Sequence, residues 1–162
     1  MAETAVPTDA EKRRKQRQAK KLRLRPPQAF RYEKPERDAG KTMVNIAQSD
    51  VVRGLVQVVK AGSGDNNLHI HTGMDSVWYV LKGRVRFYGP EDAVIGEYGP
   101  NEGILMPRNN PYWFSSVGDV DLELLQVIGM HPDVKNERVD LEERKWQVNT
   151  TEHLDGRIFE DT

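Results

Sequence analysis

Two histidines separated by one residue are the part of this sequence best suited to chemistry. His69 and His71 lie in Leu68–His71, a short run with the character of a β-strand. Side chains at positions i and i+2 of a strand share a face, so both imidazoles can reach one metal ion. Imidazole binds Fe, Mn, Ni, Cu and Zn alike, so the pair predicts one divalent transition metal of unspecified identity. The competing interpretation is a pair of packed or surface histidines.

The elements that must position this pair are short β-strands. Between residues 41 and 130, short apolar runs alternate with Gly, Pro, Asn and Asp, and no helical period is present. Many short strands at even spacing favour a barrel or a sandwich. The predicted strands are Thr42–Ala47, Val51–Lys60, Leu68–His71, Val77–Leu81, Arg84–Tyr88, Ala93–Tyr98, Gly103–Met106, Tyr112–Ser116 and Leu122–Ile128.

Two segments of this region resemble the paired motifs of the cupin superfamily. The first runs from His69-Ile70-His71 to the ending Tyr79-Val80-Leu81-Lys82-Gly83, and the second from Gly103 through Pro107 to Ser116. The resemblance covers residues 42 to 130 and is closest to small bacterial single-domain cupins of the conserved-barrel type. It implies an all-β fold, the antiparallel double-stranded β-helix or jelly-roll barrel.

The metal motif is degenerate when compared with the family pattern. Ser76 occupies the position of the family's glutamate ligand, and Tyr112 occupies that of its third histidine. Asn109 replaces a glycine, a mild change because Asn tolerates positive φ. The usual set of three histidines and one glutamate is therefore reduced to His69 and His71.

A structured open metal site needs a third ligand. Asp75 is the first candidate, because two histidines and one carboxylate suit Fe(II). Strand alternation opposes it: if Ser76 faces inward, Asp75 faces outward unless the preceding turn is irregular. Tyr112 is the second candidate, as a phenolate ligand or as a catalytic acid or base. Alternatively, its hydroxyl fills the vacant histidine position and hydrogen-bonds His69 or His71.

Strand alternation also predicts the lining of a substrate site. If the two histidines, Ser76 and Tyr112 face the interior, a further set of side chains follows them inward: Trp78, Val80, Phe114 and Gln126. A mostly aromatic lining with a few polar groups is typical of small-ligand sites. Ordinary barrel packing is the competing interpretation for Trp78 and Phe114.

Composition and charge limit the other possibilities. The 162 residues suit one domain, and the absence of cysteine excludes disulfides and thiolate sites. No apolar stretch is long enough to span a membrane, and no secretory signal is evident at the start, so we expect a cytoplasmic protein. Residues 11–25 carry nine Lys/Arg against one acid, which predicts a solvated arm or, alternatively, an electrostatic tether for nucleic acid or acidic lipid.

These observations give three zones and a ranked set of functions. We expect a flexible basic arm over residues 1–40, the barrel over 41–130, and a charged extension over 131–162 that packs on the barrel. The first hypothesis is a metal-dependent enzyme acting on a small organic substrate by dioxygenase, isomerase or lyase chemistry. The second is a non-catalytic small-molecule binder, a sensor or accessory protein. The third is a nucleic-acid-associated protein that uses the arm. The resemblance also implies a homodimer involving residues 22–50.

Overall fold

The structure is a computed structural model that describes residues 8–14, 27–63, 66–143 and 151–158. Within those ranges, no helix is long and apolar enough to cross a membrane. Residues 9–14 form a short helix whose start is capped reciprocally, because Glu11 N–H donates to Thr8 Oγ1 (3.3 Å) and Thr8 N–H donates to Glu11 Oε2 (2.8 Å). Most of the basic run, residues 15–25, lies outside the described residues.

Apart from that helix and one 3₁₀ turn, the regular structure of the described residues is β. The elements are β1 (Ala29–Phe30), β2 (Lys41–Gln48), β3 (Val52–Val59), β4 (His69–His71), β5 (Met74–Lys82), β6 (Val85–Tyr88), η1 (Pro90–Asp92), β7 (Val94–Tyr98), β8 (Gly103–Met106), β9 (Trp113–Ser116), β10 (Leu122–Met130), β11 (Arg138–Asp140), β12 (Thr151–Asp155) and β13 (Arg157–Ile158). Every strand predicted between residues 41 and 130 is present.

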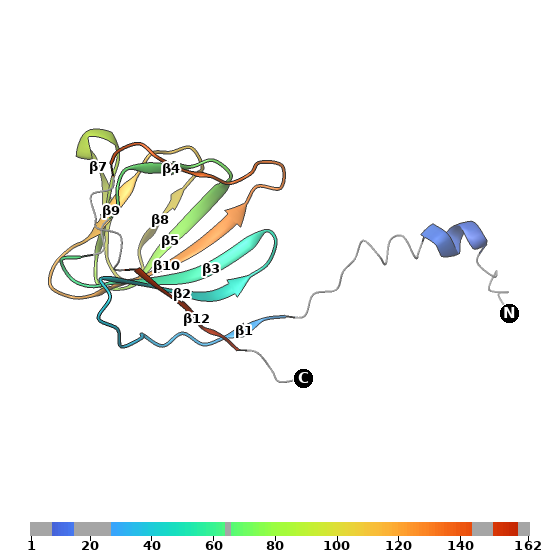
Figure 1. The fold of residues 1–162 in the computed structure, drawn as a ribbon, viewed down its shortest axis with the longest axis horizontal. Coiled ribbons are helices and arrows are strands. Elements are labelled where there is room, and N and C mark those ends of the chain that lie inside the picture. The colour runs from blue at the N-terminus through green and yellow to red at the C-terminus, as the bar shows by residue number, and fades with distance from the viewer. Residues whose placement is uncertain (1–7, 15–26, 64–65, 144–150, 159–162) are drawn as a thin grey trace.

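Two sheets curve around one apolar interior (Figure 1). The larger has the order β12-β2-β3-β10-β5-β8 and the smaller the order β7-β6-β9. The core draws on both sheets: Trp78 and Leu124 come from the larger, and Val85, Phe87 and Phe114 from the smaller. The predicted antiparallel, jelly-roll type of barrel is confirmed.

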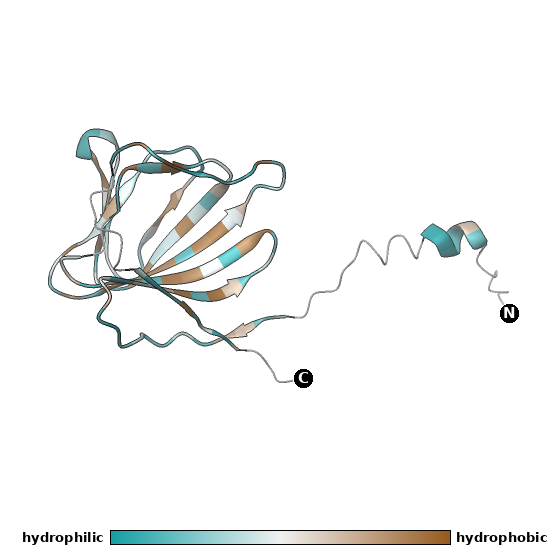
Figure 2. Cartoon of the chain, viewed as in Figure 1, coloured by the Kyte–Doolittle hydropathy of each residue, from teal (hydrophilic) through white to brown (hydrophobic). Residues whose placement is uncertain are grey.

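Alternation along β5 separates the interior from the outer face. In β5, Ser76, Trp78 and Val80 are buried, whereas the intervening Val77 and Tyr79 are exposed. Figure 2 shows hydrophobic and hydrophilic residues intermixed along the strands of the larger sheet. Successive side chains of a strand point to opposite faces, so one interior residue fixes which of its neighbours in the strand enter the barrel.

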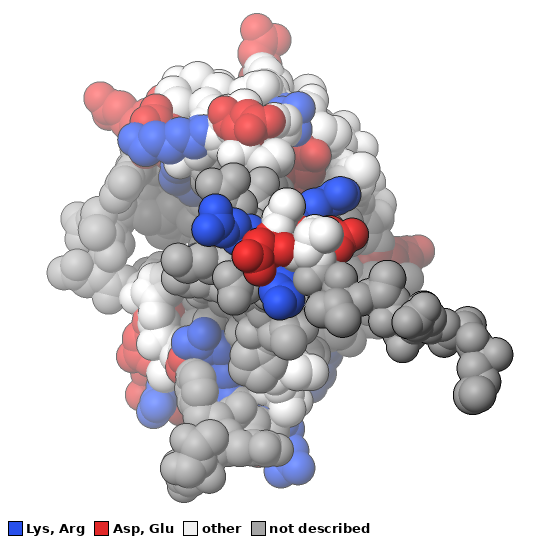
Figure 3. All heavy atoms as spheres, turned by 90° about the vertical axis from the view of Figure 1, so that its right-hand side faces the viewer, with Lys and Arg blue, Asp and Glu red and all other residues white. Residues whose placement is uncertain are grey.

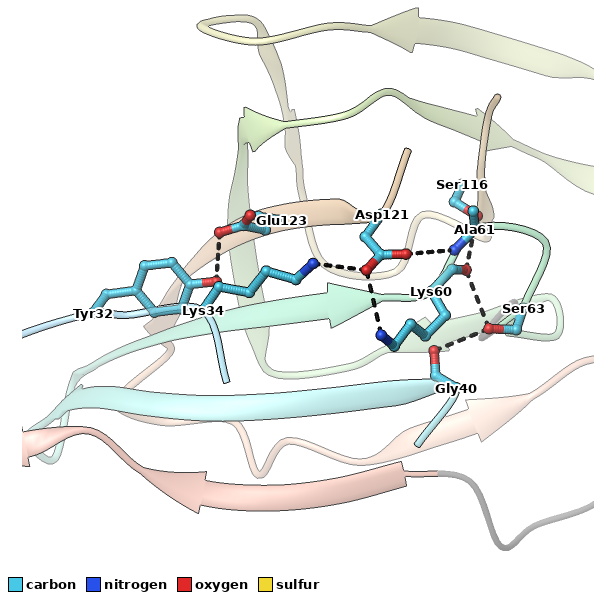
Figure 4. Close-up of polar contacts among 9 residues, drawn as sticks. All are labelled: Tyr32, Lys34, Gly40, Lys60, Ala61, Ser63, Ser116, Asp121 and Glu123. Atoms are coloured by element: carbon cyan, nitrogen blue, oxygen red, sulfur yellow. Dashed lines mark hydrogen bonds and ion pairs between the residues drawn. The ribbon is translucent and has the colours of Figure 1, made fainter. Parts of the chain in front are cut away.

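Residues 27–40, here called the N-terminal strap, lie against the outer face of the larger sheet (Figures 1 and 4). Tyr32 packs beside the apolar cluster that includes Val44 and Val56, and its hydroxyl donates to Glu123 Oε2 over 2.7 Å. Burial raises the pKa of the Tyr32 phenol, and the bond to Glu123 raises it further. The strap is therefore attached to the barrel by a partly buried hydrogen bond.

Asp121 provides a second attachment for the strap. Its carboxylate accepts from Lys34 Nζ (2.7 Å) and from Ala61 N–H (3.1 Å), and Lys60 Nζ lies 3.5 Å away (Figure 4). The hydrogen bond from Lys34 is the main reason that the pKa of Asp121 is lowered. Strap, β3 and the start of β10 meet at this one carboxylate.

The chain beyond residue 130 returns to the barrel. β11 pairs antiparallel with β4, β12 pairs parallel with β2, and β13 pairs with β1 of the strap. Acidic and basic side chains intermingle on the face shown in Figure 3. The expected homodimer stays a prediction. Of residues 22–50, the first five lie outside the described residues, and β1 and β2 pair within their own chain.

Candidate functional site

The paired imidazoles lie side by side on β4. The His69 side chain is 1% exposed and that of His71 is partly buried. Their ring centroids are 5.1 Å apart and the ring planes are nearly perpendicular, at 88°. The one-residue spacing in an extended strand accounts for this shared face.

A backbone carbonyl fixes the orientation of His69. Its Nδ1 lies 2.7 Å from the carbonyl oxygen of Asn67. A carbonyl only accepts hydrogen bonds, so Nδ1 must carry the proton, and Nε2 of the neutral ring keeps its lone pair. Metal-binding histidines in general are oriented by this kind of contact on the second ring nitrogen.

Both imidazoles are neutral at physiological pH. Burial lowers the pKa of His69 to about 4, and the charges of Arg138 and His71 act in the same direction. Burial and then Arg138 lower the pKa of His71 to about 4 as well. Neutral imidazoles are competent as metal ligands and as hydrogen-bond acceptors.

Tyr112 sits directly against His69. The two residues form a β-bridge, with backbone N–O distances of 3.0 and 3.1 Å, and their ring centroids are 4.6 Å apart. Burial raises the pKa of the Tyr112 phenol, and only the charge of Arg138 opposes this. Tyr112 is therefore a protonated phenol at neutral pH, which can donate a hydrogen bond but is not poised to bind as phenolate.

Two residues of the motif segments, Gly83 and Asn109, adopt positive φ. Gly83 (φ 78°) ends β5 at a point where a Cβ would lie 2.8 Å from the carbonyl oxygen of Asp121. Asn109 adopts φ 64° in the loop that leads to Tyr112, and its N–H donates to the carbonyl of His71 over 2.8 Å. Asn is among the few non-glycine residues that tolerate this conformation.

The remaining predicted lining residues also lie in the interior. Ser76, Trp78, Phe114 and Gln126 are each no more than 4% exposed. Trp78 lies in an aromatic group, 5.4 Å from Phe114 and 6.2 Å from Tyr112 between ring centroids. Gln126 Nε2 donates to Ser76 Oγ over 3.0 Å. The hydroxyl in the family's glutamate position is thus engaged with a neighbouring strand.

Asp75 is the one predicted site residue that the fold turns away. Its Oδ1 accepts from the backbone N–H of Arg108 over 2.8 Å, and the Arg108 guanidinium lies 3.8 Å from Oδ2. The side chain is 46% exposed, and it alternates with the interior-facing Met74 and Ser76. The strand stays regular at this point, so Asp75 lies on the outer face.

Sequence reasoning missed Arg138 and Asn67 beside the histidines, and Gln57 in the barrel interior. Arg138 of β11 stands opposite His71, and its Nη2 donates to Asn67 Oδ1 over 2.7 Å. Gln57, on β3, donates from Nε2 to Gln126 Oε1 over 2.8 Å. Gln57 carried a signal in the sequence, a polar residue in the apolar run Val56–Val59, whereas nothing local marks Asn67 or Arg138.

As a metal site, this donor set is incomplete. His69 and His71 are suitable ligands, and Nδ1 of His71 is buried without a hydrogen-bond partner. In the described ranges, however, no cluster of three His, Cys, Asp or Glu side chains could hold a metal ion. The imidazoles fit a metal, but no third protein ligand accompanies them in the part of the chain that the structure describes.

Comparisons with known proteins support the fold. No family model and no curated protein matches the chain. Among solved structures, it is similar to an uncharacterised Klebsiella pneumoniae protein with a double-stranded β-helix domain (11% identity, 67% of this chain and 91% of that chain, TM-score 0.55). It is also similar to KdgF from Halomonas sp. (14% identity, 65% and 94%, TM-score 0.54). The third is the cupin domain of Cnp3 from Schizosaccharomyces pombe (12% identity, 54% and 63%, TM-score 0.50). The chain has the cupin fold.

Proposed function

We propose that this chain binds a small organic molecule inside its barrel, in contact with His69 and His71, and that it serves as a binding protein such as a sensor or accessory subunit. The observation that carries the proposal is the buried, unpartnered Nδ1 of His71, beside an imidazole whose orientation is already fixed. A buried polar atom without a partner costs roughly 1–3 kcal/mol, which a bound molecule would offset.

The chemistry of the neighbouring groups supports binding over catalysis. The imidazoles are neutral because burial lowers the pKa of each to about 4. Tyr112 is a phenol with a raised pKa, and Ser76 is engaged by Gln126. These groups can donate and accept hydrogen bonds at neutral pH. No carboxylate among the predicted site residues reaches the imidazoles to act as a general base.

A metal-dependent enzyme is the second candidate, and one observation favours it. The contact between His69 Nδ1 and Asn67 leaves Nε2 available, as metal ligation requires. A divalent transition metal held there would supply Lewis-acid or O₂ chemistry. His69 and His71 would hold it, with the remaining positions open. The lack of a third protein ligand among the predicted site residues argues against this candidate. Asp75 is bound to Arg108, and Tyr112 is a neutral phenol.

Metal analysis and native mass spectrometry of untagged protein distinguish the two candidates. For the binding protein, we expect no stoichiometric metal and a co-purifying small molecule that is lost in the double variant His69→Ala, His71→Ala. A matched control is His131→Ala, His153→Ala, which alters two histidines outside β4. Equimolar metal that only the first pair removes would instead establish the enzyme-type site. A ligand that the β4 double variant retains would contradict the proposal.

A further inference from the structure

Four side chains form a polar belt across the middle of the barrel interior. Gln57 Nε2 donates to Gln126 Oε1 (2.8 Å), and Gln126 Nε2 donates to Ser76 Oγ (3.0 Å). Trp78 stands directly opposite Gln126 on the adjacent strand. All four are at most 4% exposed, and they come from the neighbouring strands β3, β10 and β5. These residues, Ser76, Gln57, Trp78 and Gln126, are here called the belt.

The belt has one buried acceptor and one buried donor to spare. Gln57 Oε1 and Trp78 Nε1 are both buried and have no hydrogen-bond partner. Both residues flank Gln126, one through the side-chain hydrogen bond and the other through strand pairing. Buried polar groups are nearly always satisfied in folded proteins, so each exception needs an explanation. Two exceptions of opposite polarity beside one residue point to a shared partner.

The side chains paired with the belt across adjacent strands carry no charge. The residues directly opposite its members on adjacent strands are apolar: Met43, Leu55, Leu124, Ile104, Met106 and Ile128. A charged ligand placed against these residues would lose its hydration without gaining a counter-ion. A neutral group that presents both an acceptor and a donor satisfies Trp78 Nε1–H and Gln57 Oε1 without that cost.

We propose that the belt recognises a neutral ligand of the carboxamide or lactam class, with its carbonyl accepting from Trp78 Nε1 and its N–H donating to Gln57 Oε1. This assignment rests on the proposed function, because it names the class of molecule bound inside the barrel. It adds two specificity-determining residues from strands other than β4, Trp78 of β5 and Gln57 of β3.

The probes are pyrrolidinone, γ-butyrolactone and butyrate, compared by saturation-transfer difference NMR on the full chain. Pyrrolidinone carries both donor and acceptor, the lactone only the acceptor, and butyrate a charge. We expect pyrrolidinone to bind more tightly than the lactone, and butyrate to bind weakest. Absence of pyrrolidinone binding, or butyrate binding as tight as that of the lactam, would overturn the assignment.

Two variants test the individual contacts. Trp78→Phe keeps an aromatic ring and removes the donor, so lactam binding should weaken roughly tenfold while the ligand-free protein stays folded. Gln57→Leu should remove the preference for lactam over lactone. Trp113→Phe is the matched control, since the Trp113 Nε1–H bonds Asp92 outside the interior and its loss should leave binding unchanged. Lactam affinity equal to wild type in Trp78→Phe would refute the donor role.

The same probes separate this inference from the proposed function. If the double variant His69→Ala, His71→Ala loses the co-purifying molecule while Trp78→Phe and Gln57→Leu bind pyrrolidinone as wild type does, the belt assignment fails and the proposed function stands. If Trp78→Phe and Gln57→Leu weaken pyrrolidinone binding and the histidine double variant does not, the ligand assignment of the belt is supported and the proposed contact with the imidazoles is wrong. A crystal structure in which only water bridges Trp78 and Gln57 at saturating pyrrolidinone would also contradict the lactam assignment.

Discussion

Arg138 and Asn67 join the C-terminal extension to the histidine strand. Arg138 Nη2 donates to Asn67 Oδ1 over 2.7 Å, and the backbone carbonyl of the same Asn67 holds His69 Nδ1 at 2.7 Å. The guanidinium is further held by Asp140 at 2.8 Å. Asn67 therefore contacts both the guanidinium of Arg138 on β11 and the Nδ1 atom that sets the tautomer of His69 on β4. We expect substitutions of Arg138 to change the pKa values of the histidines.

Substitution of Arg138 by Met should raise the pKa of both histidines. The positive charge of Arg138 now lowers these pKa values, whereas the carboxylate of Asp140 raises them. NMR titration of the imidazole C–H resonances measures the shift in pKa directly.

Loss of the hydrogen bond from Arg138 to Asn67 should lower the free energy of unfolding by roughly 1–2 kcal/mol. Arg84→Met, which removes a surface guanidinium paired with Glu97, is the control. Unchanged histidine titration in Arg138→Met would show that the guanidinium does not influence the pair.

Gly73 determines how closely the extension lies against β4. A Cβ at this position would be 2.6 Å from the carbonyl oxygen of Val134 and 2.7 Å from the backbone nitrogen of Asn136. Both neighbours are backbone atoms, so Gly73→Ala must displace residues 134–142, at a cost of about 1–3 kcal/mol. Hydrogen exchange should become faster at the Thr72 N–H, which now bonds Glu137 O over 3.1 Å. Gly129→Ala, where nothing lies within 4 Å of the added methyl, should leave exchange at Thr72 unchanged, and equal protection in both variants would contradict the argument.

The barrel could be predicted from the sequence because its determinants are local. Side chains alternate along β5, so parity counted from an interior Ser76 correctly separates Trp78 from Val77. The same pattern predicts that Asp75 faces outward if Ser76 faces inward. Retaining Asp75 as a ligand required an irregular turn, which the regular strand does not provide.

The contacts around the histidines could not be predicted in this way. Arg138 and Asn67 are 71 residues apart, and their meeting depends on the path that the extension takes after β10. No local pattern encodes that path. Gln57 is an intermediate case: its isolated polarity within an apolar strand was visible, but its partner Gln126 lies 69 residues away and was assigned only a facing direction.

Tyr32→Phe should loosen the N-terminal strap. The hydroxyl is the donor to Glu123, a carboxylate on a residue only 8% exposed, so its removal leaves a buried charge with one partner fewer. The expected loss is about 1–3 kcal/mol in urea denaturation. Tyr79→Phe makes the same chemical change at an exposed tyrosine bonded to Asn101, and should cost less than about 0.5 kcal/mol. Equal losses in the two variants would mean that the strap bond contributes nothing beyond a surface contact.

The buried imidazoles should make the protein acid-sensitive well above the range where carboxylates titrate. Burial lowers the pKa of His69 and of His71 from 6.5 to about 4 in the folded chain. As the pH falls below about 6.5, the histidines bind protons in the unfolded chain, whereas in the folded chain they stay neutral until about pH 4. The contribution of the neutral histidines to the free energy of unfolding is therefore fully present above about pH 6.5 and declines between about pH 6.5 and 4. At about pH 5 the loss amounts to about 2 kcal/mol for His69, taking 1.36 kcal/mol per pKa unit. The loss is smaller for His71, because solvent screens this less buried ring.

Urea unfolding of chelator-treated protein at about pH 7.5 and about pH 5 measures this loss. The variant His69→Gln, His71→Gln should lose much less stability over the same interval, because glutamine does not titrate. Matched changes at His131 and His153 should retain the wild-type loss. If wild type and the β4 variant declined equally between the two pH values, the two imidazoles would have to be solvated in the folded protein, and the interior placement of the pair would be wrong.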